Sequence, residues 1–343
     1  MYVVTHMYVP YINRMYMYAC ICTQVMGQAD GKKGIWAYIE GGMGAVSNAI
    51  AASAREHGAE ILTYASVDSI LLGNNSQVTG VNVNGSILEA DIVISGATPY
   101  HTMVDLITPY HPAALPKTYL EHIMNTDYTC GAFKINLVVD RLPNFTCYPS
   151  PVDGQPGPMH RGTRTHTVLA YTLYISCYCM YTCIWCDMCY VGTVHFESTL
   201  QELEDAYLCA SVGCPAKRPV IEMTIPSALD PTLAPVGRHI IQLFIQYAPY
   251  DLSSKYGGSW SDVTYKQSFV NRVYSIIEEY CPGFRASIVY EDLLSPLDLE
   301  RIFGLYKGEC KMCMSARECM WRTYNMYVCM CVYLLVHIIC ILV

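Results

Sequence analysis

The sequence predicts an α/β protein with mixed sheets, and three observations favour this class. Segments that read as strands alternate along the chain with segments of helical periodicity. The alternation has no strict strand–helix–strand rhythm, which suits a mixed-sheet substrate domain better than a nucleotide-binding domain. A glycine-rich turn, Glu40-Gly41-Gly42-Met43-Gly44, leads directly into a helical segment. With 343 residues, the chain has room for one large domain or two intertwined ones.

Residues 45–57 are expected to form the helix after this turn, and Gly58 follows where glycine commonly ends a helix. Glycine in the turn allows the backbone to pass close to a helix or a ligand, because it has no Cβ. The turn is not the dinucleotide fingerprint GxGxxG, since the third glycine, counted from Gly42, would fall at Ser47. The apolar positions at helical spacing are Val46, Ala49, Ile50 and Ala54.

A small sheet is expected next. Residues 60–67 read as one strand, and 77–94 read as two more, joined by a turn at Asn84-Gly85. Residues 90–99 run as a strand into a turn that contains a proline. Residues 115–125 are expected to be a helix that begins after two prolines.

The second half of the chain is predicted to contain four strands and three helices. Ser198 is the expected cap of the first helix, Ser295 caps the last one with Pro296 at its first position, and the last helix ends after Leu305. Two of the strands, 220–225 and 239–247, are expected to pair. The predicted strands are 132–140, 193–196, 220–225 and 239–247. The predicted helices are 198–210, the amphipathic 261–281 and the one that begins after Ser295. A proline- and glycine-rich loop spans 144–162.

The composition argues against nucleic-acid binding, and the distribution of cysteines divides the chain into two kinds of segment. A net charge of −8, without a basic patch interleaved with aromatic residues, argues against a nucleic-acid-binding protein. Eighteen cysteines and 29 tyrosines are abnormal numbers for a soluble enzyme. Thirteen of the cysteines lie in residues 1–26, 164–191 and 306–343, and the other five are sparse, as in a reduced intracellular protein.

The cysteine-rich segments differ from the rest in kind. Met326-Tyr327-Val328-Cys329 is what a tandem ATGT repeat encodes in frame, and residues 1–26 fit neither a signal peptide nor a transit peptide. We hypothesise that these segments are translated repeat or intron sequence. The predicted organisation is a low-complexity N-terminus (1–30), a first globular part (31–163), a spurious Cys/Tyr-rich insert (164–191), a continuation of the globular part (192–305) and an apolar Cys-rich tail (306–343).

Four runs of sequence resemble one family. They are GKKGIWAYIEGGMGAVSNAIAASAREHGAEI, FKINLVVDRLPNF, RPVIEMTIPSALDPTLAP and SPLDLERIFGL. In this order they resemble the flavin-dependent phytoene desaturase and amine oxidase superfamily. The resemblance implies a two-domain FAD-dependent oxidoreductase that acts on a carbon–carbon or carbon–nitrogen bond, a location in the mitochondrial matrix, and a mitochondrial inner-membrane protein partner. It also implies that 31–163 is an FAD and substrate-domain part and that 192–305 continues the substrate domain.

The resemblance also implies where FAD would bind. It places Val67, in a strand at 65–71, where the backbone pairs with the adenine end of the flavin nucleotide, and it places Ser95, Ala97 and Pro99 in a turn near the cofactor. Family members have an N-terminal βαβ unit with GxGxxG and a glycine-rich segment near the C-terminus. Neither is found in this sequence. We therefore expect a chain truncated at both ends that binds FAD weakly, because the phosphates lack their helix N-terminus, and that is inactive.

No catalytic residue can be named, because flavin chemistry resides in the isoalloxazine ring. His101, His111, His160 and His195 are scattered, and each is more typical of a surface or packed histidine than of a base. The substrate is a small molecule of unknown identity.

Two features suggest functions other than catalysis. The cysteines from Cys177 to Cys189 and the pair Cys310 and Cys313 have zinc-knuckle spacing but not the flanking residues of a zinc ribbon, so no metal site is predicted. Residues 168–186 and 328–343 are apolar and close to the minimum length of a membrane span. The alternatives are therefore a non-enzymatic interaction or regulatory protein with an apolar tail anchor, and a cysteine-rich metal-binding module.

Overall fold

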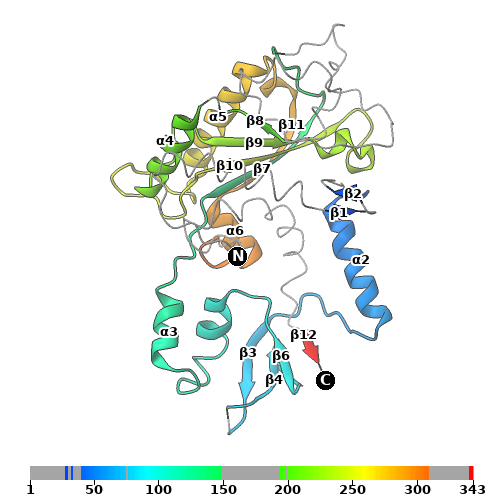
Figure 1. The fold of residues 1–343 in the computed structure, drawn as a ribbon, viewed down its shortest axis with the longest axis vertical. Helices are drawn as coiled ribbons and strands as arrows, with labels where there is room; N and C mark the ends of the chain where they lie inside the picture. Colours follow the sequence, from blue (N-terminus) through cyan, green and yellow to red (C-terminus); the bar gives the residue numbers. More distant parts are fainter. Residues whose placement is uncertain are drawn as a thin grey trace. The chain divides into compact units, whose positions relative to one another are not determined.

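A computed structural model of the protein describes residues 40–74, 76–147, 193–197 and 199–308, and the backbone alone of 28–29, 32–33 and 340–342. The chain divides into two compact units (Figure 1). The first unit comprises Met1–Gly42 and Thr129–Leu299, and the second comprises Met43–Tyr128 and Glu300–Val343. Each unit therefore combines segments that lie far apart in the sequence.

The first unit contains a five-stranded antiparallel sheet with the strand order β11-β7-β10-β9-β8. The expected pairing of residues 220–225 with 239–247 is confirmed, with Thr224 opposite Gln242. A two-stranded ladder of β1 (Gln28–Ala29) and β2 (Lys32–Lys33) also belongs to this unit. The five strands are β7 (Ala132–Val139), β8 (Val194–His195), β9 (Val220–Thr224), β10 (His239–Gln246) and β11 (Ile288–Leu294).

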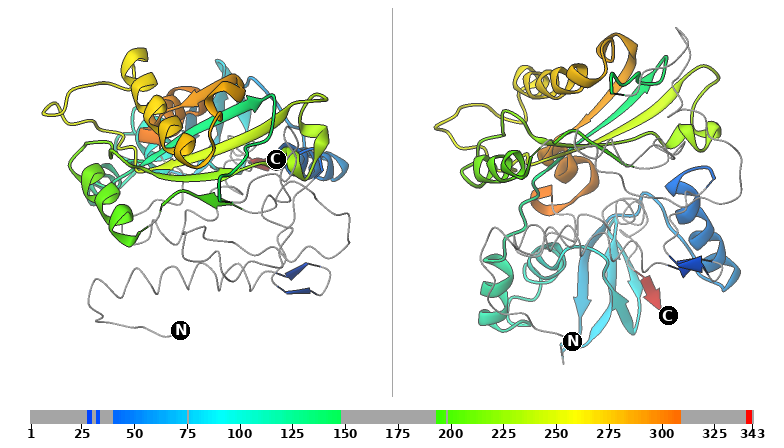
Figure 2. Two further views of the ribbon diagram at one scale, coloured as in Figure 1. Left: turned by 90° about the horizontal axis from the view of Figure 1, so that it is seen from above. Right: turned by 45° about the horizontal axis from the view of Figure 1, so that its top comes forward.

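Helix α5 (Val263–Tyr280) covers one face of this sheet (Figure 2). The side chains of a strand alternate between its two faces, so the buried residues Phe133, Ile135 and Leu137 of β7 point together into the core against α5. Asp262 begins this helix by accepting hydrogen bonds from the amides of residues 264 and 265. The amphipathic pattern of 261–281 thus predicted the helix that builds the main core.

Two shorter helices have N-terminal caps that can be compared with the predictions. Helix α4 (Leu200–Ser211) is capped by Thr199, whose hydroxyl accepts from the Glu202 amide, so the prediction of Ser198 as the cap is wrong by one residue. Helix α6 (Pro296–Phe303) begins as predicted, with Ser295 before Pro296. The remaining short turns of this unit are the 3₁₀ segments η4 (Pro226–Ala228), η5 (Pro231–Leu233) and η6 (Arg285–Ser287).

The second unit contains a three-stranded antiparallel sheet in the order β3-β4-β5. Asn84 and Gly85 both have positive φ, as the predicted Asn-Gly hairpin turn requires. The expected strand 60–67 is wrong, because Tyr64 adopts a positive φ of 59° and interrupts the extended chain, whereas the strand at 65–71 implied by the family resemblance agrees with β3, which begins at Val67. The strands are β3 (Val67–Leu72), β4 (Val78–Val83) and β5 (Ser86–Glu89), and a third strand of 77–94 is β6 (Ile92–Ile94).

A π-helix that the sequence did not predict follows this sheet. It is joined to β3 by a hydrogen bond of 2.9 Å from the Ile70 amide to the Leu106 carbonyl. Strand β6 pairs with β12 (Cys340–Leu342). The buried apolar core of this unit comprises Ile70, Val81, Val83, Leu106 and Ile107. The helical segments are α2 (Met43–Glu56), the π-helix η1 (His101–Asp105), α3 (Lys117–Met124) and the 3₁₀ turn η7 (Tyr306–Gly308).

Candidate functional site

The turn predicted to lie near the cofactor connects β6 to η1. Ser95 organises it: its hydroxyl accepts a hydrogen bond from the Ala97 amide at 3.2 Å and shares another with the Thr102 hydroxyl at 2.7 Å. Thr102 is buried within η1, so the Ser95 side chain joins the end of the strand to the helix. Pro99 begins the helical residues that lead into η1, two positions before His101. The structure therefore brings Ser95, Ala97 and Pro99 into one compact turn.

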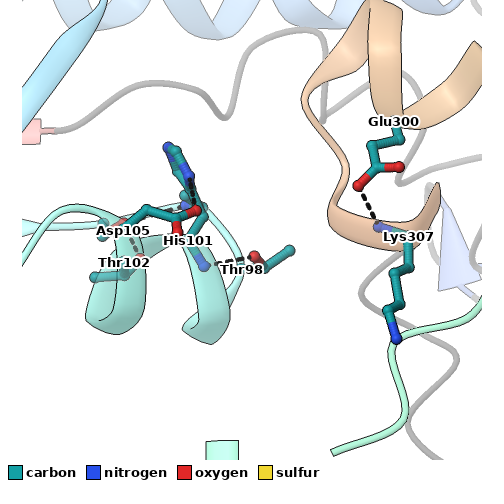
Figure 3. Close-up of polar contacts among 8 residues, drawn as sticks. Thr98, His101, Thr102, Asp105, Glu300 and Lys307 are labelled. Atoms are coloured by element: carbon teal, nitrogen blue, oxygen red, sulfur yellow. Dashed lines mark hydrogen bonds and ion pairs between the residues drawn. The ribbon is translucent and has the colours of Figure 1, made fainter. Parts of the chain in front are cut away.

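Thr98 and the π-helix complete this turn (Figure 3). The buried Thr98 accepts the His101 amide on its hydroxyl at 3.1 Å and the Thr102 amide on its carbonyl at 2.9 Å. The Nδ1 atom of His101 lies 2.9 Å from Asp105 in an exposed pair. π-Helical turns are rare in proteins, and those that occur often lie at functional sites.

Val67, the fourth predicted residue, is the first residue of β3 and lies opposite Val83 of β4. It is half-buried and packs against the apolar core of the second unit, as does Val93 of β6. Val67 and the turn thus belong to the same unit but come from different strands. Their assignment to a flavin site remains a prediction.

Three tyrosines form a cluster beside the turn that sequence analysis missed. The rings of Tyr100 and Tyr306 are stacked, with centroids 3.8 Å apart, and Tyr128 meets both rings edge-on. A hydrogen bond with Tyr306 is the main reason that the pKa of Tyr100 is raised, and burial adds to it. No sequence pattern indicates that these three rings meet; the glycines near Tyr306, Gly304 and Gly308, show only that the chain turns there, since both have positive φ.

Lys307, the next residue, has the left-handed backbone conformation, with φ of 52°. A non-glycine residue in this conformation is uncommon and costs free energy. Its amide donates a 3.0 Å hydrogen bond to a carboxylate oxygen of Glu300, which holds the turn against the end of α6 (Figure 3).

The glycine-rich turn is held by a carboxylate of its own unit. The Gly41 amide donates to Asp230 at 2.6 Å, and Thr232 also donates to Asp230 with its amide and hydroxyl. Hydrogen bonds from Thr232, and then from Gly41, lower the pKa of Asp230. A Cβ on Gly42 would lie 3.1 Å from the Leu233 side chain. The close approach expected of this glycine is therefore made to the η5 loop.

A row of polar side chains crosses the sheet of the first unit. Asp292, Asn136, Gln242 and Thr224 are consecutive cross-strand partners on β11, β7, β10 and β9. They lie on the face opposite the one packed against α5, because Asn136 alternates with the core residues of β7. The Asn136 amide donates to Asp292 at 3.2 Å, and its oxygen Oδ1 is buried without a hydrogen-bond partner among the described residues.

His195 lies on the same face at the edge of the sheet, opposite Glu222. Its Nδ1 atom is 3.4 Å from Glu197, and both side chains are largely buried. Burial by itself would lower the pKa of His195, but the hydrogen bond to Glu197 and the charges of Glu222 and Glu197 outweigh it and raise the pKa. Glu197 also accepts the Ile221 amide at 2.5 Å, so it holds His195 and the end of β9 together.

The other candidates from the sequence are distributed as follows. His111 is a packed residue whose Nε2 accepts the Leu72 amide at 3.2 Å. His160 and the cysteines from Cys177 to Cys189, with Cys310 and Cys313, lie outside the described residues. Within the described ranges, no group of three His, Cys, Asp or Glu residues is placed to hold a metal ion, and each helix is too short or too polar to cross a bilayer.

Known proteins share much of this sequence. Residues 14–182 match the family model described as flavin containing amine oxidoreductase. Over 285 residues, 83% of this chain, the sequence is 39% identical to pyridine nucleotide-disulfide oxidoreductase domain-containing protein 2 of Rattus norvegicus and 37% identical to that of Mus musculus. The sequence is also 28% identical to 4,4'-diapophytoene desaturase (4,4'-diapolycopene-forming) of Methylomonas sp, over 106 residues. This alignment covers 31% of this chain and 20% of the relative.

The chain spans less than half of the rat and mouse relatives, since the alignments cover 43% of each. The α/β class predicted from the sequence is confirmed, with sheets whose strand pairs are antiparallel throughout the described residues. The resemblance to the phytoene desaturase and amine oxidase superfamily is confirmed as well. The family match lies in residues 14–182, just under half of the chain, and the similarity found is to flavin-containing amine oxidoreductases.

Proposed function

We propose that this sequence belongs to an FAD-dependent oxidoreductase of the phytoene desaturase-like class. The observation that carries the proposal is the 39% identity over 285 residues to a relative named as an oxidoreductase-domain protein, together with the flavin family match. The identity to a diapophytoene desaturase supports that class of reaction. In such a reaction the bound flavin would accept a hydride from the substrate, and the protein would orient the substrate and exclude water.

In this proposal the second unit supplies part of the flavin site. The residues would be Val67 at the start of β3 and Ser95, Ala97 and Pro99 in the turn before η1. The hydroxyl-linked turn is a rigid element that can present backbone groups to a nucleotide, which is what a cofactor site requires. Ser95 would act by holding the backbone of the turn in place.

The 343-residue chain by itself is expected to bind FAD weakly and to be inactive. No GxGxxG motif occurs in its sequence, so the flavin phosphates would lack the helix N-terminus that stabilises their charge. The chain should purify colourless, without a flavin absorbance band near 450 nm. Retention of stoichiometric FAD through gel filtration would show that this expectation is wrong.

The proposed flavin class is tested in a longer protein. In a chimera, the residues of this chain replace their counterparts in the rat relative, and the bound cofactor is released by denaturation and identified by chromatography. We expect FAD at the same occupancy as in the rat protein, and lower occupancy when Ser95→Ala is added. A folded chimera without flavin, beside a rat protein that carries it, would contradict the proposal.

A mitochondrial matrix location is also proposed, on the basis of the family resemblance. Immunodetection of the endogenous protein in fractionated cells tests it. The protein should be protected from protease in intact mitochondria and should become sensitive once the inner membrane is opened.

A further inference from the structure

In the first unit, the segment after β7 (residues 141–147) and the C-terminal end of α5 each carry a cysteine where they meet. The Thr146 amide donates a 2.8 Å hydrogen bond to the Tyr280 carbonyl, and the Thr146 hydroxyl donates a second one at 3.2 Å. These two residues are 134 positions apart in the sequence. Cys147 and Cys281 are the next residue on each segment, so the fold brings two distant cysteines to one place.

Packing brings both cysteine side chains to the same apolar core. Cys281 is a core residue with 1% exposure, and Cys147 is half-buried and packs against that core. The ring of Phe196 joins the two segments, with its centroid 6.4 Å from the Phe145 ring and 5.6 Å from the Tyr280 ring. The residue before each cysteine therefore contacts the same aromatic side chain.

The ionisation of Cys281 shows that the two sulfur atoms are neighbours. Burial raises the pKa of the Cys281 thiol, and the charge of Cys147 and then that of Glu278 raise it further. The repulsion between two thiolates falls with distance, so it reports a nearby sulfur. Both residues are thiols in the structure. A half-buried thiol beside a fully buried one is a pair in which the first meets an oxidant and the second can react with the product.

The backbone of Cys281 is the more firmly fixed of the two. Its amide donates to the Ile277 carbonyl at 2.9 Å, and its carbonyl accepts the Phe284 amide at 3.0 Å. Cys147 lies in a turn, one residue beyond the hydrogen-bonded Thr146. A disulfide requires Cα atoms about 4.4–6.8 Å apart. Any movement that the bond requires is therefore expected in the turn and not in the helix.

We propose that Cys147 and Cys281 form a reversible disulfide when the protein meets hydrogen peroxide, and that this bond links the segment after β7 to α5. The Cys147 thiolate attacks one peroxide oxygen, the O–O bond breaks, and the other oxygen takes up a proton and leaves as water. The Cys281 thiolate then attacks the sulfur of the Cys147 sulfenic acid, and the sulfenic oxygen leaves as a second water. Two thiols thus lose two electrons and two protons, and one hydrogen peroxide becomes two waters.

The positions of the two thiols favour this order of steps. Cys147 is the more exposed and is reached first. Its sulfenic acid is neutral, so the first step removes one of the charges that raise the pKa of Cys281 and makes the second thiol easier to ionise. Disulfides in reducing compartments are usually transient, which fits a bond that forms under oxidant and is later reduced.

Peptide mapping of the full chain tests the pair, because trypsin releases the two cysteines in separate peptides that contain no other cysteine. Residues 142–161 contain Cys147, and residues 273–285 contain Cys281. The protein is titrated with hydrogen peroxide, the remaining thiols are blocked with N-ethylmaleimide, and the digest is analysed by mass spectrometry before and after reduction. We expect Cys281 to be linked to Cys147 at least about tenfold more often than to any other cysteine, because groups held together react at a high effective concentration.

Two matched variants assign the steps. In Cys281→Ala the sulfenic acid of Cys147 has no thiol to react with, so dimedone should label residues 142–161 several-fold more than in the wild type. In Cys147→Ala, Cys281 should remain a thiol at the peroxide concentrations that oxidise it in the wild type. The absence of linked peptides from oxidised wild-type protein would overturn the proposal whether or not the variants fold. Equal dimedone labelling of the wild type and folded Cys281→Ala would do so as well.

The disulfide should also stabilise the fold, because it closes a long loop of the unfolded chain. Peroxide should raise the melting temperature of the wild type, dithiothreitol should reverse the rise, and Cys147→Ala should show none. A wild type that carries the bond without this rise would contradict a link between the segment after β7 and α5. None of these measurements needs flavin, so failure of the chimera to carry FAD would leave the cysteine pair unaffected.

Discussion

Ser95 shows how one side chain organises the turn after β6. Its hydroxyl contacts both the Ala97 amide and the buried Thr102 hydroxyl, so it connects three segments of backbone with two hydrogen bonds. Serine and threonine hydroxyls favour such local turns, which is why these residues gather where strands end. The role of Ser95 within the fold is thus local, whatever it contributes to a cofactor.

At this scale we predict that Ser95→Ala lowers the free energy of unfolding by about 1–2 kcal/mol, because Thr102 loses its buried partner. Urea denaturation measures the change. Ser86→Ala, at an exposed position of β5, is the control and should shift stability by less than about 0.5 kcal/mol. Equal effects of the two substitutions would show that the Ser95 hydroxyl does not hold the turn.

At the scale of elements, the glycine-rich turn contains two glycines with opposite requirements. Gly42 has a φ of 77° and lies close to Leu233, so it needs both the left-handed conformation and the missing Cβ. Gly44 lies in α2, and a Cβ there would meet no atom within 4 Å. The two positions therefore form a matched pair for substitution.

Gly42→Ala should destabilise the protein by about 1–2 kcal/mol, since an L-residue is strained at this φ. Gly44→Ala should instead stabilise α2 by up to about 1 kcal/mol through better helix propensity. Thermal unfolding of both variants measures the difference. If Gly42→Ala were as stable as Gly44→Ala, the contact with the η5 loop would not constrain the turn.

The start of α6 is held by a network around Asp298. Its carboxylate accepts from the Ser295 amide and hydroxyl and from Lys266 of α5, while the Asp298 amide donates back to Ser295. The Ser295–Asp298 exchange is a capping box in which aspartate takes the place of glutamate. Lys266 and Asp298 are only 17% and 6% exposed, so the ion pair is screened little by water.

Asp298→Ala is predicted to cost about 3–5 kcal/mol of unfolding free energy, because it leaves the Lys266 charge buried and uncompensated. The exposed pair Lys117–Glu121 on α3 is the comparison, and Glu121→Gln should cost less than about 0.5 kcal/mol. Chemical denaturation of both variants measures the two losses in the free energy of unfolding. A loss below 1 kcal/mol for Asp298→Ala would mean that the buried pair hardly contributes.

At the scale of the whole molecule, charge predicts how stability depends on pH. Hydrogen bonds lower the pKa of Asp230 and Glu278; burial opposes the same effect at Asp298, but bonds from Lys266 and Ser295 outweigh it. A lowered pKa in the folded state means stability that is present above about pH 4 and lost as pH falls through the folded value. His195 has a raised pKa, so its contribution is complete below about pH 6.5 and is lost as pH rises through the folded value.

Stability should therefore be greatest between about pH 4.5 and 6.5. Melting temperatures recorded from pH 3 to pH 9 test this expectation. His195→Gln should flatten the alkaline side of the curve, and Asp298→Asn should flatten the acid side. An unchanged alkaline side in His195→Gln would show that the histidine does not couple to folding.

Much of the architecture was predictable because it rests on local patterns. The amphipathic period of 261–281 predicted α5, the Ser295-Pro296 pair predicted the start of α6, and Asn84-Gly85 predicted the β4–β5 turn. The strand expected at 60–67 was wrong because Tyr64 turns the chain there, a conformation that no residue pattern announces. The π-helix was missed for a similar reason: its residues have no distinct sequence signature.

The sequence by itself determined the α/β class, most elements and the flavin-related family, because propensity, periodicity and long family-like runs are properties of contiguous residues. Only the tertiary structure decided which distant residues meet. Asn136 faces Asp292 across 156 residues, and Gly41 binds Asp230 across 189. Strand register and loop packing select these pairs, and the free energy of such contacts depends on the assembled sheet. The polar row and its unpaired acceptor therefore became visible only in the folded chain.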